Sequence, residues 1–157
     1  IKSDPTIEAT FSADPDLWVM AHPLELSRAI QNLITNAMRY GRSDDGQLRI
    51  SLGVHRSEDG RDAVLEVADQ GKGLPAAERE RVMRPFERGE AARSGVTGSG
   101  LGLAIVDRIV RRSGGSVELG DASPHGLLVR VRFPLAPKAE LKKSMKAQEK
   151  AARETER

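Results

Sequence analysis

The sequence predicts an α/β two-layer sandwich, in which a mixed, mostly antiparallel sheet carries helices on one face. Several short segments alternate between apolar and polar residues and are joined by short turns, which is typical of antiparallel strands. Two longer segments carry apolar residues at steps of three, four and seven, which is typical of amphipathic helices. Strands and helices do not alternate regularly, so a Rossmann-type parallel sheet is not expected.

The first part of the chain predicts two short strands and a long helix. The strands are expected at residues 7–11 and 17–20, with a turn between them. The helix is expected to begin at Pro23, because proline is tolerated in a first helical turn, and to end before Gly41. Its buried stripe is expected to consist of Leu26, Ala29, Ile30, Leu33, Ile34, Ala37 and Met38.

The rest of the chain predicts four more strands, two more helices and a loop. The strands are expected at residues 48–54, 63–68, 117–119 and 127–133, and the helices at residues 76–83 and 101–110. Residues 87–100 contain glycine and serine without periodicity and predict a mobile loop. Prolines at 134 and 137 then indicate a domain covering residues 1–137, followed by a charged tail at 138–157 that is helical or disordered.

Charge and composition disfavour several function classes. The tail carries seven Lys or Arg and four Glu, a net +3, so the formal charge of +2 leaves residues 1–137 at about −1. A basic nucleic-acid-binding surface is therefore not expected on the domain. The absence of cysteine excludes disulfides, thiolate metal sites and a cysteine nucleophile. For the tail, a basic membrane- or partner-binding helix is the minor alternative to a solvated extension.

Two asparagines, Asn32 and Asn36, are four residues apart on the helix expected from Pro23, so they share one face beside the apolar stripe. An amide oxygen can ligate a hard cation such as Mg²⁺. Nearby, Arg39 can reach a phosphate and Tyr40 can stack on a base. On these residues alone, the plain alternative that both asparagines face water stays open.

A turn with two glycines directly follows the strand expected at residues 63–68. Gly71 and Gly73 permit close approach of a ligand to the backbone. The carboxylate of Asp69, at the head of the turn, can accept a hydrogen bond from an exocyclic amine such as that of adenine. An ordinary turn headed by Asp is the alternative.

Glycines recur where the mobile loop runs into the next expected helix, at Gly98, Gly100 and Gly102. Unpaired N–H groups at a helix start favour phosphate binding. Upstream, residues 84–89 form an Arg-Pro-Phe-Glu-Arg-Gly motif. Phe86 can plug a pocket beneath the loop, or simply anchor the loop, and Arg88 can meet a phosphate.

Taken in order, these motifs resemble the N, G1, F and G2 boxes of sensor histidine kinases. They are Asn-x-x-x-Asn, Asp-x-Gly-x-Gly, Arg-Pro-Phe-x-Arg-Gly and Gly-x-Gly-Leu-Gly-Leu-Ala-Ile-Val, and the resemblance spans residues 8–134. It implies the Bergerat ATP-binding fold, which is shared with Hsp90, type II topoisomerases and MutL. The sequences of residues 28–41 and 88–93 look especially similar to those of the EnvZ osmosensor branch.

The resemblance implies a site for ATP and Mg²⁺. Asn36 would ligate Mg²⁺ and Arg88 would approach the γ-phosphate, so these two are the candidate catalytic residues. Asp69 would bind the adenine amine. The loop at residues 87–100 would form a lid over the phosphates, with Phe86 beneath it. The other implied binding residues are Asn32 and Arg39 at the phosphates, Tyr40 at the adenine, Gly71 and Gly73 in the turn, Gly98, Gly100 and Gly102 in the lid, and Leu101 and Leu103 in the wall of the nucleotide site.

The implied function is to bind Mg-ATP and present its γ-phosphate to a histidine on a separate dimerisation and phosphoacceptor domain. None of His22, His55 and His125 has an acceptor context, a helical histidine followed by an acidic residue, so the chain is interpreted as an excised fragment. Its implied partners are ATP or ADP, the phosphoacceptor domain and, through the parent, a response regulator. The fragment is expected to be monomeric, and the parent a homodimeric bacterial inner-membrane sensor with this domain in the cytoplasm.

Two other functions stay open at this point. An anti-sigma-type serine kinase on the same fold would need a carboxylate base near the asparagines, and Glu25, seven residues before Asn32, is badly spaced for that role. A regulatory domain that binds ATP without transferring phosphate is the non-enzymatic alternative.

Overall fold

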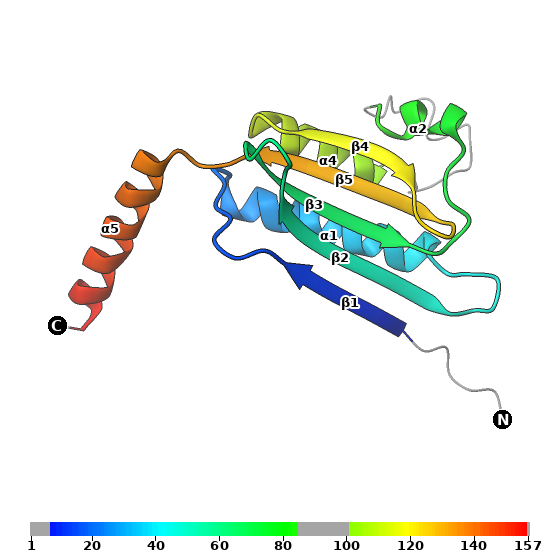
Figure 1. The fold of residues 1–157 in the computed structure, drawn as a ribbon, viewed down its shortest axis with the longest axis horizontal. Coiled ribbons are helices and arrows are strands. Elements are labelled where there is room, and N and C mark those ends of the chain that lie inside the picture. The colour runs from blue at the N-terminus through cyan, green and yellow to red at the C-terminus, as the bar shows by residue number, and fades with distance from the viewer. Residues whose placement is uncertain (1–6, 85–100, 157) are drawn as a thin grey trace.

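The computed structural model describes residues 7–84 and 101–156, and it has the predicted two-layer architecture (Figure 1). Five strands form one sheet in the order β1-β2-β3-β5-β4. β1 runs parallel to β2, and the other neighbours are antiparallel. The strands are β1 (Ile7–Ala13), β2 (Leu48–Arg56), β3 (Asp62–Asp69), β4 (Ser116–Asp121) and β5 (Leu127–Pro134).

Two long helices, α1 (Pro23–Tyr40) and α4 (Leu101–Arg112), pack side by side on one face of the sheet (Figure 1). Every third or fourth residue of α1 is apolar, so the helix buries a stripe against the strands. The centre of the core is formed by the buried residues Ala29, Leu33, Ala37, Leu48, Ile50, Leu65, Val67, Leu103, Val106, Ile109, Val110, Val129, Val131 and Phe133.

Two helices contribute no fully buried residue to this core. The short helix α2 (Ala76–Val82) follows the turn after β3 and has no fully buried residue. The tail forms α5 (Lys138–Thr155), which begins directly after Pro137 and projects from the domain without burying a residue (Figure 1). Of the two predicted forms of the tail, the structure therefore has the helical one. None of the described helices combines the length and apolar composition needed to cross a bilayer.

The strand predicted at residues 17–20 is wrong. This segment makes only one isolated bridge, between Val19 and Leu135, supported by a hydrogen bond from the Ala136 N–H to the Trp18 carbonyl (2.7 Å). A longer ladder is blocked because the opposing segment is bounded by prolines at 134 and 137, which have no N–H to donate. The other predicted strands and helices are confirmed within a few residues at each end.

Candidate functional site

The two asparagines of α1 lie beside its buried stripe, as predicted. Both are half-buried, and the amide nitrogens of Asn32 and Asn36 are fully enclosed without a hydrogen-bond partner among the described residues. A buried donor left unpaired costs about 1–3 kcal/mol. Rotation of the amide by half a turn exchanges its oxygen and nitrogen, so each side chain can offer either atom to a ligand.

Gly102, in the first turn of α4, lies directly against Asn36. A Cβ atom at Gly102 would be 2.9 Å from Asn36 Nδ2 and 3.1 Å from Asn36 Oδ1. Only glycine lets α4 approach the amide this closely. The structure thus brings together two residues that the sequence assigned to different motifs, whereas the next residue, Leu103, is 3 % exposed and belongs to the core.

Asp69 ends β3, is 6 % exposed, and is anchored through one of its two carboxylate oxygens. Oδ1 accepts hydrogen bonds from the backbone N–H of Gly71 (2.9 Å) and of Leu127 (3.2 Å). No hydrogen bond from the described residues reaches Oδ2. A carboxylate can accept about four hydrogen bonds, so Asp69 is held firmly and still has capacity for a donor on a ligand.

Three glycines allow three chain segments to converge on Asp69. A Cβ at Gly41, just after α1, would lie 2.6 Å from Asp69 Cβ, and a Cβ at Gly126, before β5, would lie 2.1 Å from the Asp69 carbonyl oxygen. A Cβ at Gly71 would lie 2.1 Å from the carbonyl oxygen of Tyr40. The end of α1, the turn after β3 and the β4–β5 connection therefore meet at one end of the sheet.

Sequence reasoning identified Gly71 and Gly73 but missed the packing roles of Gly41 and Gly126. It treated Gly41 only as the residue after the helix and assigned no role to Gly126. In the sequence, only the residue type pointed to these packing roles, because a single glycine gives no indication of the distant segment that packs against it. Gly73, with φ of +72°, needs its glycine for the backbone and lies against Gly126.

Further contacts fix the turn that follows Asp69. His125 Nδ1 lies 3.1 Å from the carbonyl oxygen of Gly71. Arg79 of α2 donates to the carbonyl of Leu74 (3.0 Å) and pairs with Asp121 at the end of β4 (2.5 Å). The contact of His125 with the Asp69 turn is a tertiary feature that the sequence did not indicate.

Arg39 and Tyr40, at the end of α1, are both exposed, and Tyr40 keeps 46 % of its surface accessible. Their side chains make no hydrogen bond with another described residue, so both are available to a ligand. Among the described residues, no group of three or more His, Cys, Asp or Glu could hold a metal ion.

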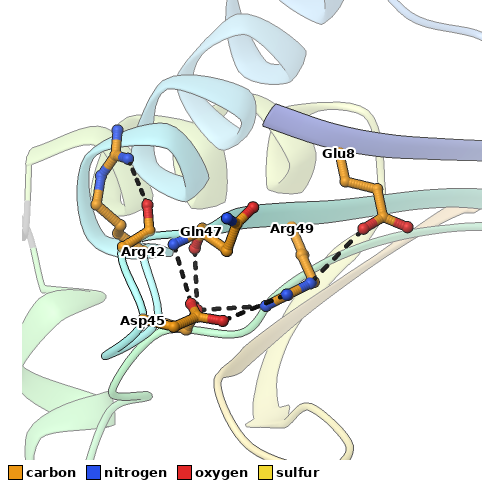
Figure 2. Close-up of polar contacts among 7 residues, drawn as sticks. Glu8, Arg42, Asp45, Gln47 and Arg49 are labelled. Carbon is orange, nitrogen blue, oxygen red and sulfur yellow. Dashed lines mark hydrogen bonds and ion pairs between the residues drawn. The ribbon is translucent and has the colours of Figure 1, made fainter. Parts of the chain in front are cut away.

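The loop after Gly41 is tied to the sheet by the charged cluster in Figure 2. Hydrogen bonds from the Ser43 hydroxyl and the Gln47 N–H, with the Arg49 guanidinium, hold the pKa of Asp45 below its ordinary value. Arg49 lies 3.3 Å from Asp45 and 3.6 Å from Glu8 of β1. These contacts connect the edge strand β1 to the loop between α1 and β2.

Four predicted site residues, Phe86, Arg88, Gly98 and Gly100, lie outside the described residues, as does the predicted lid at 87–100. Leu101 is described only as the first residue of α4. Their roles stay predictions.

Comparison with known families matches residues 21–137 to the model described as "Histidine kinase-, DNA gyrase B-, and HSP90-like ATPase". The chain is 36% identical over 114 residues to sensor histidine kinase Hik2 of Synechocystis sp. (71% of this chain, 26% of Hik2). It is 33% identical over 128 residues to sensor histidine kinase CpxA of Escherichia coli (80% and 26%). It is 41% identical over 117 residues to the histidine-protein kinase/phosphatase MprB of Mycolicibacterium smegmatis (74% and 23%). The chain thus spans about a quarter of the length of these curated relatives.

Solved structures show the same fold. A mycobacterial sensor histidine kinase MprB is 31% identical with a TM-score of 0.67, covering 83% of both chains. The histidine kinase domain of the E. coli osmosensor EnvZ is 36% identical with a TM-score of 0.54, covering 84% of this chain and 76% of that one. The catalytic domain of histidine kinase ThkA, at 22% identity and a TM-score of 0.69, supports the fold alone (83% and 82%). Since relatives with several names match, the assignment to the EnvZ branch stays a prediction.

Proposed function

Because this chain belongs to the family of histidine kinase-, DNA gyrase B- and HSP90-like ATPases, we propose that it binds Mg-ATP and presents the γ-phosphate for transfer to a histidine on a separate domain. The observation that carries the proposal is the pair of enclosed, unpartnered amides of Asn32 and Asn36. Burying two such groups is unfavourable unless a ligand completes their hydrogen bonding or coordination.

The base is proposed to bind at Asp69. Its Oδ2 is proposed to accept a hydrogen bond from the amino group of adenine, while Oδ1 stays tied to Gly71 and Leu127. Gly73 shapes the turn, and the exposed ring of Tyr40 lines the base. In a partly buried site, a fixed acceptor such as Oδ2 binds a ligand that offers a donor. It rejects a ligand that offers a second acceptor at the same position.

The phosphates are proposed to bind between α1 and α4. The Asn36 oxygen would ligate Mg²⁺, and Asn32 and Arg39 would contact phosphate oxygens, with Gly102 leaving room beside Asn36. When bound, Mg²⁺ would neutralise the charge that develops on the transferred phosphoryl group. The protein would contribute by positioning and by a preorganised polar environment. From sequence resemblance alone, Arg88 is proposed at the γ-phosphate, Leu101 and Leu103 in the wall, and Phe86, Gly98 and Gly100 in the lid.

The phosphate acceptor is proposed to lie on a dimerisation domain of a longer parent chain. Within this chain, His22 precedes a proline, His55 lies on β2 next to an arginine, and His125 lies in the β4–β5 connection. None has a neighbouring acidic residue on a helix. The parent is proposed to be a homodimeric inner-membrane sensor that holds this domain in the cytoplasm and passes the phosphate to a response regulator.

The serine-kinase alternative is weakened by the position of its candidate base. Glu25 pairs with Arg112 at the far end of α4, with 3.0 Å between Oε1 and Nη1. Seven residues along a helix amount to about 10 Å, so Glu25 is well removed from Asn32. A carboxylate engaged there is poorly placed to take a proton from a substrate hydroxyl beside the asparagines.

The decisive experiment is titration with a fluorescent ATP analogue, with and without Mg²⁺. The wild-type chain is expected to bind saturably and more tightly with Mg²⁺, and Asn36→Ala to lose the effect of Mg²⁺. Thr35→Ala, an exposed neighbour on the same helix, is the matched control and should behave like wild type. If the wild type bound no nucleotide, the central proposal would be wrong.

The transfer step has its own assay. With ATP labelled at the γ-phosphate and a supplied histidine-bearing dimerisation domain, label is expected on that histidine. Label on a protein serine instead would favour the anti-sigma-type kinase.

A further inference from the structure

The β4–β5 hairpin holds the Asp69 turn at three points, two at the strand ends and one in the connection between them. The Leu127 N–H donates to Asp69 Oδ1 (3.2 Å), and His125 Nδ1 lies 3.1 Å from the Gly71 carbonyl. Asp121 holds Arg79, which in turn donates to the Leu74 carbonyl. We propose that His125, through its contact with Gly71, is a positioning residue that sets the selectivity of Asp69 for a 6-amino over a 6-oxo purine nucleotide. This inference rests on the proposed role of Asp69.

The chemistry of the contact fixes the direction of the hydrogen bond. A backbone carbonyl oxygen only accepts, so Nδ1 of His125 must carry the hydrogen that it donates to Gly71. Nε2 is then the nitrogen without a hydrogen when the ring is neutral. Because Nδ1 is protonated in both the neutral form with this tautomer and the cation, the hydrogen bond exists in both states.

Gly71 transmits the contact to the carboxylate. Its carbonyl accepts from His125, and its own N–H donates to Asp69 Oδ1 (2.9 Å). Glycine has the widest conformational freedom of all residues, so a turn around Gly71 needs restraint from outside itself. With both polar groups of Gly71 engaged, Oδ1 of Asp69 is fixed, and the direction of Oδ2 is fixed with it.

Fixing Oδ2 matters for choosing between purines. Adenine offers an amino group at C6, which donates to a carboxylate. Guanine offers a carbonyl oxygen at C6, which would face the carboxylate as a second acceptor. A rigid carboxylate rejects guanine through this repulsion, whereas a mobile carboxylate can shift to the neighbouring ring N–H of guanine and accept from it. Loosening the turn is therefore expected to lower selectivity as well as affinity.

The test compares the dissociation constants of fluorescent ATP and GTP analogues. His125→Ala is expected to weaken ATP binding about three- to tenfold, the effect of one lost hydrogen bond, without the same loss for GTP, so that the ATP-to-GTP preference falls. His125→Asn keeps a donor close to the position of Nδ1 and should restore the preference. His22→Ala, an exposed histidine that makes no cap hydrogen bond, is the matched control and should keep the wild-type preference.

The outcomes separate this inference from the proposed function. If wild type binds neither nucleotide, the proposed function fails. If wild type prefers ATP and His125→Ala keeps that preference, or weakens both nucleotides equally, the role assigned to His125 is wrong.

A second measurement does not depend on the alanine variant folding. The ¹⁵N spectrum of the His125 ring in alkaline buffer is expected to show the proton on Nδ1. A proton on Nε2 would overturn the hydrogen bond on which the inference stands.

Discussion

The turns at the two ends of β3 both contain an aspartate near a glycine, but the two aspartates differ in burial and in where their hydrogen-bond partners come from. At one end, the β2–β3 turn contains Asp59, whose Oδ1 accepts from the Ser57 hydroxyl (2.6 Å) and the Arg61 N–H (3.0 Å). Both hydrogen-bond partners of the Asp59 carboxylate lie within two residues of it in the sequence, and Asp59 is exposed. At the other end, Asp69 is buried, and one of its two partners, Leu127, is 58 residues away.

This difference distinguishes a turn whose aspartate is held by local hydrogen bonds from a site that is assembled from distant parts of the chain. The Asp59 carboxylate finds both of its hydrogen-bond donors within its own turn. The Asp69 turn places a carboxylate in a low-exposure position, where it is costly unless paired, and it leaves one oxygen open. A costly and incompletely paired group is a natural candidate for ligand recognition.

The largest predicted effect on stability tests how tightly the Asp69 end is packed. Gly126→Ala is expected to destabilise the fold by about 3 kcal/mol or more, because the new Cβ would lie 2.1 Å from the Asp69 carbonyl oxygen at a φ of +113°. Gly60→Ala is the matched control at the other end of β3. Gly60 also has positive φ (+74°) but nothing within 4 Å of its Cβ position, so about 1 kcal/mol is expected.

Thermal denaturation measures this comparison. A loss of about 3 kcal/mol corresponds to a decrease of roughly 6–12 °C in melting temperature for a chain of this size. Equal decreases for the two variants would mean that the Asp69 end is no more tightly packed than an ordinary turn.

The second prediction tests recognition rather than packing. In Asp69→Asn, the amide oxygen can keep the hydrogen bonds from Gly71 and Leu127, but an NH₂ donor replaces Oδ2 and would face the amino group of adenine. Binding of an ATP analogue is expected to weaken roughly tenfold or more, the range for a lost hydrogen bond to a charged group. The control, Asp59→Asn, is expected to leave affinity unchanged. Unchanged affinity in Asp69→Asn would remove the assignment of base recognition.

The sequence predicted the sheet class and most elements because those depend on local periodicity. The strands 48–54 and 63–68 are confirmed, because apolar residues at alternating spacing favour one buried face. The α1 stripe is confirmed except at Met38, which was predicted to be buried and is 47 % exposed because it lies at the edge of the stripe. The segment 17–20 was predicted wrongly because its pairing depends on prolines more than 110 residues away, which no local window includes.

The site was predictable by residue type but not by contact. Asp69, Gly71 and Asn36 stood out because a carboxylate, a turn glycine and mid-helix asparagines each require a reason. The partners of these residues, Gly126 and Gly102, are identified only when strands and helices are assembled. Asp59 carries a local signature similar to that of Asp69, an Asp with a glycine one or two residues later, and burial separates the structural turn from the candidate site.

The smallest predicted effect is a pH dependence that arises from two exposed aspartates, Asp45 and Asp59, each held by hydrogen bonds from its own turn. Hydrogen bonds from Ser57 and from the Arg61 N–H hold the pKa of Asp59 below its ordinary 3.8, and those from Ser43 and the Gln47 N–H do the same for Asp45. A carboxyl group whose pKa is lower when folded stabilises the fold above the ordinary pKa, and this stabilisation is lost as pH falls below 3.8 through the folded value.

The double variant Asp45→Asn/Asp59→Asn should therefore show a flatter decrease of melting temperature as pH is lowered from 5 to about 3. Asp44→Asn is the control, because the Asp44 carboxylate accepts no hydrogen bond from the described part of the chain, and it should retain the wild-type acid profile. If the double variant lost melting temperature as steeply as wild type over this range, the turn carboxylates would not be a source of acid sensitivity. The acid sensitivity of the fold would then have to arise outside these two turns.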